Sequence, residues 1–211
     1  MNESFRLLCE EKQNRIRNAA MMVFSQNSYR KASTDDIAAQ AGISKGLLFY
    51  HFKTKKELYC DMYEYCCERI YHAVEAIGAM NETDFFERNR LIVQARLNAA
   101  ARNPYLLDFG LRAYYETDPL ICESITAINS RILSDGLAQL SDHLDTSKFR
   151  SQADIPRAIK MIVWIGDGLI KERLQQGALD TDLLRDEVAA YFDLMKVGFY
   201  CERTTREEDF D

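Results

Sequence analysis

Apolar side chains recur at every third or fourth position along most of the chain, a spacing that places them on one face of an α-helix. Strand-like alternation bounded by tight-turn residues does not occur, and only three prolines are present. We therefore predict an all-α fold of about nine helices. The first clear apolar stripe lies in residues 10–27 and consists of Ile16, Ala19, Ala20, Val23 and Phe24.

Caps and helix breakers set the limits of the predicted helices. Pro104 opens a short helix, and Asp118 followed by Pro119 opens the next one, because proline suits the first helical position. Gly177 suits a C-cap. The predicted helices cover residues 10–27, 34–41, 44–51, 54–80, 84–102, 104–115, 119–143, 155–176 and 181–201.

The segment from residue 33 to residue 52 has a pattern of its own. Ser33 or Thr34 can cap a first short helix through its hydroxyl, and Ser44 can cap a second. Gly42 between them suits a sharp turn that needs a positive φ. The segment is therefore predicted to form two short helices joined by a tight turn.

The apolar positions of this segment indicate how the two short helices pack. Ala38 is small, which lets the second helix cross close by, and Leu48 and Phe52 lie four residues apart on the side that faces the core. The opposite side of the second helix is then free to enter a DNA major groove, which is about 12 Å wide. We interpret the segment as a helix-turn-helix.

The charge distribution supports this interpretation, although the net charge of −6 alone argues against nucleic acid. Residues 12–56 carry nine basic side chains and only Asp35 and Asp36 as acids, a local charge of +7. Residues 61–211 carry 17 basic and 27 acidic side chains, a local charge of −10. A basic end on an acidic body is expected when only that end meets phosphate.

The outer face of the second short helix supplies candidate DNA contacts. Lys45 can donate to guanine O6 and N7 or to phosphate, and Gly46 removes a side chain where backbone can approach DNA. Tyr50, His51 and Lys55 can donate to phosphate oxygens, which set affinity and register. Leu47, Phe49 and Lys53 complete the face and its immediate sequel.

At these residues the stretch IAAQAGISKGLLFYHFKTKKEL resembles the signature of the tetracycline-repressor (TetR) family, with a match over roughly residues 10–60. The resemblance implies an all-helical fold with a three-helix DNA-binding head, here residues 1–55, and a ligand-binding and dimerisation body, residues 56–202. The polar composition of residues 203–211 predicts a flexible acidic tail. It also implies DNA contacts at positions that include Thr34. The full predicted DNA-binding set is Thr34, Ser44, Lys45, Gly46, Leu47, Phe49, Tyr50, His51, Lys53 and Lys55.

Two residues depart from the family signature. Leu47 stands where a small polar residue is frequent, and Phe49 where tyrosine is usual. Both suggest apolar contact with thymine methyl groups in place of a hydrogen bond. The operator sequence therefore does not carry over from relatives.

The last two predicted helices are apolar around more than one face, which is more than a single core contact needs. The favoured interpretation is a four-helix dimer interface made from residues 155–176 and 181–201 of each subunit; the alternative is a pair of core helices in a monomer. A twofold pair of heads reading a palindromic operator also gains specificity. The predicted function is therefore that of a DNA-binding transcriptional regulator, a repressor that binds a palindromic operator in double-stranded DNA as a homodimer and is released by a small-molecule ligand.

The middle helices carry large amphipathic side chains, some of which can line a pocket for a small-molecule effector. Most of them are equally compatible with core positions. The acidic body hints at a cationic ligand, although solubility explains the acidity as well. The candidate ligand-binding residues are Tyr63, Phe109, Tyr114, Tyr115, Trp164 and Asp167.

The six cysteines form no C-x-x-C pair and are interpreted as buried, reduced thiols. A redox sensor at Cys60 and Cys67, seven residues apart on one helix face next to Cys66, is the alternative. No apolar run reaches the ~20 residues of a membrane span. The N-terminus lacks the apolar block of a secretory signal, and a cytoplasmic location without membrane association is expected.

Other function classes have weaker support in the sequence. His72 has Glu68 and Glu75 nearby but lacks the H-E-x-x-H spacing of a metal site, and neither a Gly-rich phosphate loop nor a nucleophile elbow occurs. An enzyme, a metal and a cofactor are therefore not predicted. Two alternatives remain: a helical adaptor that binds another protein through its acidic body, and a DNA-binding regulator that acts without a ligand. Weak binding to duplex DNA would distinguish the adaptor.

Overall fold

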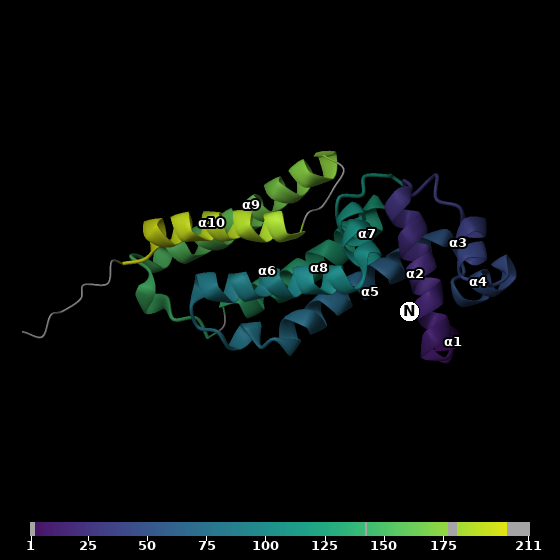
Figure 1. The fold of residues 1–211 in the computed structure, drawn as a ribbon, viewed down its shortest axis with the longest axis horizontal. Helices are drawn as coiled ribbons and strands as arrows, with labels where there is room; N and C mark the ends of the chain where they lie inside the picture. Colours follow the sequence, from purple (N-terminus) through teal and green to yellow (C-terminus); the bar gives the residue numbers. More distant parts are fainter. Residues whose placement is uncertain (1–2, 142, 177–180, 202–211) are drawn as a thin grey trace, which may run out of the picture. The chain divides into compact units, whose positions relative to one another are not determined.

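The computed structural model describes residues 3–141, 143–176 and 181–201, and these contain ten α-helices and no strand. The predicted all-α fold is therefore confirmed (Figure 1). Three 3₁₀ turns follow α5 or precede α9, at Ala79–Asn81, Thr146–Lys148 and Gln152–Asp154. The α-helices are α1 (Glu3–Arg6), α2 (Glu10–Gln26), α3 (Thr34–Gln40), α4 (Lys45–His51), α5 (Lys55–Ala76), α6 (Phe85–Arg102), α7 (Pro104–Tyr114), α8 (Cys122–Ser141), α9 (Ile155–Gln176) and α10 (Thr181–Phe199).

Two predicted helix limits are wrong, and each has a local cause. The long helix predicted to reach residue 80 ends at Ala76, because Gly78 takes a left-handed conformation with φ of 65°. The helix predicted to begin at Pro119 begins at Cys122, because the Asp118 carboxylate and carbonyl hold a turn over the intervening residues. The expected C-cap at Gly177 and the tail 203–211 lie outside the described residues.

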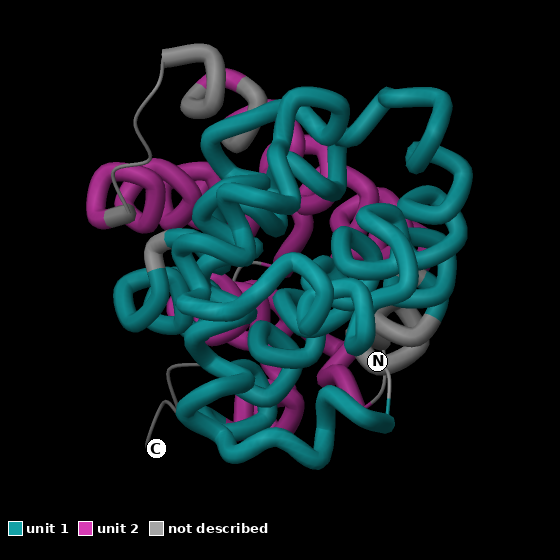
Figure 2. The backbone as a smooth tube through the Cα atoms, turned by 90° about the vertical axis from the view of Figure 1, so that its right-hand side faces the viewer, with its two compact units in different colours: residues 1–77, 95–141 teal, residues 78–94, 142–211 magenta. Residues whose placement is uncertain are grey.

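The chain divides into two compact units, drawn in different colours in Figure 2. The first comprises Met1–Ile77 and Ala95–Ser141, and the second comprises Gly78–Gln94 and Asp142–Asp211. The predicted head lies within the first unit, together with α7 and α8. Among the described residues, none of the helices combines the length and the apolar content that a membrane span requires.

The core of the first unit surrounds α2, which packs against α3, α5 and α7. Three rings from these helices meet at its centre. The ring centre of Tyr59 lies 4.8 Å from that of Phe24 and 5.0 Å from that of Phe109, each in an edge-to-face arrangement. Such aromatic pairs add about 0.5–1.5 kcal/mol to the stabilisation that burial alone provides. Because α3 packs against α2 and α4 packs against α3, both short helices are supported by a core that extends beyond the head.

The second unit has an aromatic core with a buried carboxylate beside it. Phe86 contacts the rings of Phe149, Phe192 and Tyr200. The Asp84 carboxylate accepts hydrogen bonds from Lys148 Nζ at 2.9 Å and from the Tyr200 hydroxyl at 3.1 Å. A hydrogen-bonded ion pair therefore joins the start of α6 to the segments on either side of α9 and α10.

Candidate nucleic-acid interface

Side-chain caps fix the ends of the helix-turn-helix. Ser33 Oγ accepts the backbone N–H of Asp36 at 3.3 Å, and Ser44 Oγ accepts that of Leu47 at 3.1 Å. Gly42 between the helices has φ of 63°, so a residue with a side chain would be strained there. The predicted caps and turn are confirmed, with Ser33 as the first cap.

The inner face of the helix-turn-helix is closed by apolar packing. Ile37, Ala38 and Ala41 of the first short helix and its end are at most 3% exposed. Leu48 and Phe52 are 1% and 0% exposed. The predicted inward-facing positions are therefore confirmed, and they determine which side chains remain on the outer face.

Most of the predicted DNA contacts lie at the surface of α3 and α4. Tyr50 is 67% exposed. Apart from the adjacent residues and the backbone of α4 itself, Ser44 Oγ is the one described atom within 4 Å of a methyl group placed on Gly46. The outer face thus offers a phenol, an ammonium and an uncovered stretch of backbone. Ser44, Lys45, Gly46, Tyr50 and Lys53 are exposed, and Thr34, Leu47 and Phe49 are half-buried.

One ion pair spans the outer face from α3 to α4. Lys45 Nζ lies 2.9 Å from Asp35 Oδ2, and the two side chains are 52% and 66% exposed. The pair brings a donor and an acceptor side by side at the start of the second helix. Sequence reasoning placed Asp35 only as a favourable charge in the first turn of its helix and did not identify this pairing.

His51 was expected at the DNA surface, and the structure places it in the core instead. Its side chain is 2% exposed, Nδ1 lies 3.1 Å from Ser4 Oγ, and the ring meets Phe5 edge-to-face at 5.8 Å. Burial, assisted by the charge of Lys12, lowers the pKa of His51. A buried, neutral imidazole does not bind phosphate. His51 instead packs the end of α4 against α1.

Lys55 also has a role other than the expected phosphate contact. Its ammonium donates to the backbone carbonyl of Arg30 at 3.2 Å and lies 4.8 Å from the ring centre of Tyr29. Burial lowers the pKa of Lys55, although the charge of Asp118 opposes this effect. Lys55 therefore fastens the start of α5 to the loop before α3.

Sequence reasoning missed α1, which completes the core of the head. Phe5 is 0% exposed, and its ring centre lies 4.8 Å from that of Phe52. The Arg17 guanidinium lies 5.4 Å from the ring centre of Phe5 and 4.3 Å from that of Tyr65. A four-residue helix is too short to show an apolar period, and isolated phenylalanine before Glu10 was the only available signal.

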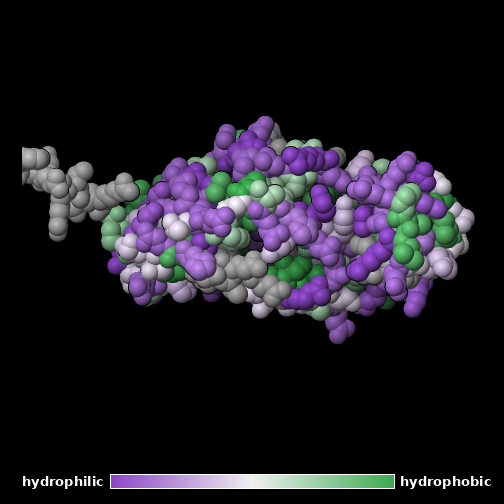
Figure 3. All heavy atoms as spheres, turned by 90° about the horizontal axis from the view of Figure 1, so that it is seen from below, coloured by the Kyte–Doolittle hydropathy of each residue, from purple (hydrophilic) through white to green (hydrophobic). Residues whose placement is uncertain are grey.

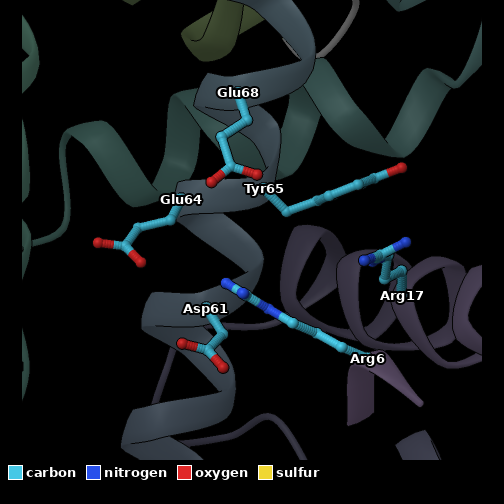
Figure 4. Close-up of a pocket in the computed structure, with 6 residues that line it drawn as sticks. All are labelled: Arg6, Arg17, Asp61, Glu64, Tyr65 and Glu68. Atoms are coloured by element: carbon cyan, nitrogen blue, oxygen red, sulfur yellow. The ribbon is translucent and has the colours of Figure 1, made fainter. Parts of the chain in front are cut away.

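A polar cavity of about 290 Å³ lies beside α1 in the first unit. Figure 4 shows Arg6 reaching toward the carboxylates of α5, while Arg17 lies beside the ring of Tyr65. Charged groups of both signs line the cavity, unlike the mostly apolar pocket expected for a small-molecule effector. The lining residues are Arg6, Arg17, Asp61, Glu64, Tyr65 and Glu68.

The loop between α7 and α8 makes two polar links that sequence reasoning also missed, one to the head and one to α5. Arg30 Nε donates to Asp118 Oδ2 at 2.7 Å, and the Tyr59 hydroxyl donates to Glu116 Oε2 at 3.3 Å. The hydrogen bond from Arg30 lowers the pKa of Asp118. These residues lie 57 or more positions apart in sequence, so no local pattern signals their contact.

The candidate ligand-binding residues have different surroundings. Phe109 and Tyr63 are 0% and 4% exposed and belong to the core of the first unit, where a ligand reaches them only after rearrangement. Tyr114 and Tyr115 form an edge-to-face pair at the end of α7. In the second unit, Trp164 is 59% exposed on α9, and Asp167 is half-buried one turn further along.

The three neighbouring cysteines of α5 resemble structural thiols. Cys66 is 0% exposed and lies 3.6 Å from the Met21 sulfur. Burial raises the pKa of Cys60 and of Cys67 to about 11 and raises that of Cys66 further. Because the thiolate is the reactive form, protonated thiols at neutral pH argue against the redox-sensor alternative.

Comparison with protein families locates the similarity in the head. The family model described as bacterial regulatory proteins, tetR family, matches residues 16–62. The HTH-type transcriptional activator FasR of Mycolicibacterium smegmatis is 33% identical over 113 residues, which are 54% of this chain and 49% of that protein. The nucleoid occlusion factor SlmA of Edwardsiella ictaluri is 31% identical over 104 residues, which are 46% of this chain and 52% of that protein. The chain spans about half the length of these curated relatives.

Solved structures share the fold over most of the chain. A TetR-like transcriptional regulator from Rhodococcus sp. RHA1 has a TM-score of 0.67 at 21% identity, covering 92% of this chain and 100% of that one. The fatty acid degradation regulator FadR from Bacillus halodurans has a TM-score of 0.67 at 20% identity, covering 85% and 96%. The family model thus matches residues 16–62 and the curated relatives about half of the chain, whereas the similarity of fold covers 85–92% of it.

Proposed function

We propose that the chain is a DNA-binding transcriptional regulator, because the family model described as bacterial regulatory proteins, tetR family, matches its residues 16–62. It represses by binding a palindromic operator as a homodimer, and a small-molecule effector releases it. The observation that carries the proposal is the outer face of α4, where Lys45 and Tyr50 are exposed beside the bare backbone of Gly46. Such a regulator acts on DNA in the cytoplasm without a cofactor.

Dimerisation through the second unit supplies the second head. α9 packs against α10, and the pair leaves large apolar side chains in water. Two heads on a palindrome are held one helical turn, about 34–36 Å, apart. The exposed apolar residues that support this interface are Met161, Trp164, Leu183, Tyr191, Leu194 and Val197.

Release by an effector requires a path from residues 56–202 to the predicted head, residues 1–55. Three residues separate the end of α4 from the start of α5, and α5 packs against α2, α7 and α8. The ion pair between Arg30 and Asp118 provides a second link to the α7–α8 loop. An effector that shifts α5 or this loop changes the orientation of α4, and a few kcal/mol of preference for that state is sufficient.

The proposal is tested by selecting bound fragments from genomic DNA and measuring their affinity by fluorescence anisotropy. We expect nanomolar to micromolar binding to an enriched palindrome and at least a hundredfold loss in Lys45→Ala with Tyr50→Ala, because both groups face DNA. Lys53→Ala is the matched control, since loss of a phosphate contact weakens binding to every sequence and reduces its salt dependence. An adaptor protein would enrich no fragment.

A further inference from the structure

We propose that Asp35 determines operator specificity: together with Lys45 it reads a single G·C base pair in the major groove. The inference rests on the proposed function and adds a reading residue outside the second helix. Its starting observation is the ion pair between Lys45 Nζ and Asp35 Oδ2, 2.9 Å apart on the outer face of the helix-turn-helix.

A carboxylate on this surface is electrostatically unfavourable, because the DNA backbone repels it. Residues 12–56 contain only Asp35 and Asp36 as acids among nine basic side chains. An exposed ion pair contributes about 0–1 kcal/mol to stability, so folding alone gives little reason for Asp35 to face Lys45. A favourable contact in the DNA complex offsets the repulsion.

If Lys45 contacts a base edge, the Asp35 carboxylate beside it is also close enough to contact that base pair. The N-terminal residues of a recognition helix contact base edges, and Lys45 is the first residue of α4. The Asp35 oxygen that pairs with Lys45 lies 2.9 Å from its ammonium. Within the part of the chain that the structure describes, the other oxygen, Oδ1, accepts no hydrogen bond, and 66% of the side chain is exposed. Asp35 therefore retains, on a mostly exposed side chain, one carboxylate oxygen that no group of the described chain engages.

The donor and acceptor order of the pair matches a G·C base pair, in which the guanine O6 acceptor lies beside the cytosine N4 donor; in an A·T pair adenine N6 donates and thymine O4 accepts at these two positions. Guanine presents O6 and N7 as acceptors to the major groove, and its partner cytosine presents the N4 amino group as a donor. Lys45 donates to the guanine while Asp35 accepts from the cytosine N4 amino group. Thymine offers an acceptor and a methyl group at that edge, which the carboxylate rejects.

The test is selection from a random duplex library with three proteins: wild type, Asp35→Ala and Asp36→Ala. Asp36 is the matched control, because it is an exposed acid in the same first helical turn and makes no ion pair with Lys45. We expect wild type and Asp36→Ala to require G·C at one position of each half-site. Asp35→Ala should bind DNA at least as tightly as wild type overall. Its preference for G·C over the other base pairs should fall by about tenfold or more, at that position alone.

Three outcomes contradict the inference. A uniform gain in affinity of Asp35→Ala for all sequences would mean that the carboxylate only neutralises Lys45. Retained G·C preference in Asp35→Ala would mean that Lys45 reads alone, and a selected A·T pair would exclude the assigned base pair. Circular dichroism melting verifies that both variants fold. If wild type enriches no sequence at all, the proposed function fails and the inference fails with it.

Discussion

The helix-turn-helix and the α9–α10 pair differ in how far their large apolar side chains are exposed. In the first, Leu48 and Phe52 are enclosed by the same chain, and the outer face is mostly polar. In the second, Leu194 and Val197 are 72% and 75% exposed. Figure 3 shows that, on the face it draws, hydrophobic residues reach the surface in patches among hydrophilic ones. Large contiguous apolar surface in water indicates an interaction site. The helix-turn-helix therefore buries its apolar side chains within one chain, whereas the α9–α10 pair exposes apolar side chains that the proposed partner copy would cover.

The largest expected effect concerns the closed core of the head. Phe52→Ala removes a fully buried ring that packs on Phe5 and should lower the free energy of unfolding by about 3–5 kcal/mol. Urea denaturation followed by circular dichroism measures this loss. Tyr50→Ala, two residues earlier at the end of α4, removes a ring that is 67% exposed and should change stability by less than about 0.5 kcal/mol. Equal effects of the two variants would mean that α4 has no distinct inner face.

The next effect concerns the open surface of the second unit. Leu194→Glu with Val197→Glu places two charges in the proposed interface and should raise the dimer dissociation constant by at least about thirtyfold, the equivalent of one hot-spot residue. Sedimentation velocity measures the mass. Trp164, the single tryptophan, provides a fluorescence signal that should shift to longer wavelength on dissociation.

A charge on another exposed apolar residue provides the control for the dimer prediction. Tyr71 on α5 is 45% exposed in the first unit, so Tyr71→Glu should leave the dimer mass unchanged. A wild-type chain that sediments as a monomer at micromolar concentration would remove the contrast between the two regions. Loss of the dimer in both variants would indicate misfolding instead of a specific interface.

Acid should lower the stability of the second unit, because a buried ion pair stabilises this unit. Burial alone would raise the pKa of Asp84, but hydrogen bonds from Lys148 and the Glu87 backbone, with the charge of Lys196, hold it below the usual value. The folded pKa lies below the unfolded one, so this stabilisation is complete above about pH 4 and is lost as the pH falls through the folded pKa. In Asp84→Asn, the urea midpoint of Trp164 fluorescence should be lower at pH 7 and less dependent on pH below 4. Asp193→Asn, at a carboxylate that is 70% exposed, should keep the wild-type profile.

The smallest expected effect is a loss of stability of the head as the pH falls below neutral. Burial and the charge of Lys12 lower the pKa of His51, so the unfolded chain binds the proton more readily than the folded one. Stability is therefore full above about pH 6.5 and declines as the pH falls from there toward the folded pKa. Melting between pH 7.5 and 5 should reveal this decline, and His51→Gln, which keeps a polar partner for Ser4, should reduce it. An unchanged slope in His51→Gln would assign the decline to another group.

The sequence predicted those parts of the head that depend on neighbours in the chain. Ser33, Gly42 and Ser44 specify caps and a turn through their own chemistry, and Leu48 and Phe52 specify the inner face through helical spacing. His51 follows the same spacing as the surface residues and was misplaced, because its burial depends on Phe5, which lies more than forty positions earlier. Helical period alone does not reveal a distant covering element.

The remaining features depend on contacts between distant segments. The pairing of Arg30 with Asp118 spans 88 positions and that of Lys148 with Asp84 spans 64. Charged side chains are frequent along the chain, so no pattern distinguishes those that pair from those that remain solvated. The Asp35–Lys45 pair crosses only ten positions, yet it too requires the angle between the two short helices.

The Phe5 ring under α4 has a consequence for exchanging heads among regulators. The family match begins at residue 16, and a chimera joined at that boundary would omit the residue that covers His51 and Phe52. The transplanted head would expose part of its core and lose the Arg17 contact with that ring. A transferable DNA-reading module from this chain therefore starts at Glu3, and its donor and recipient must be matched at α1 as well as at α5.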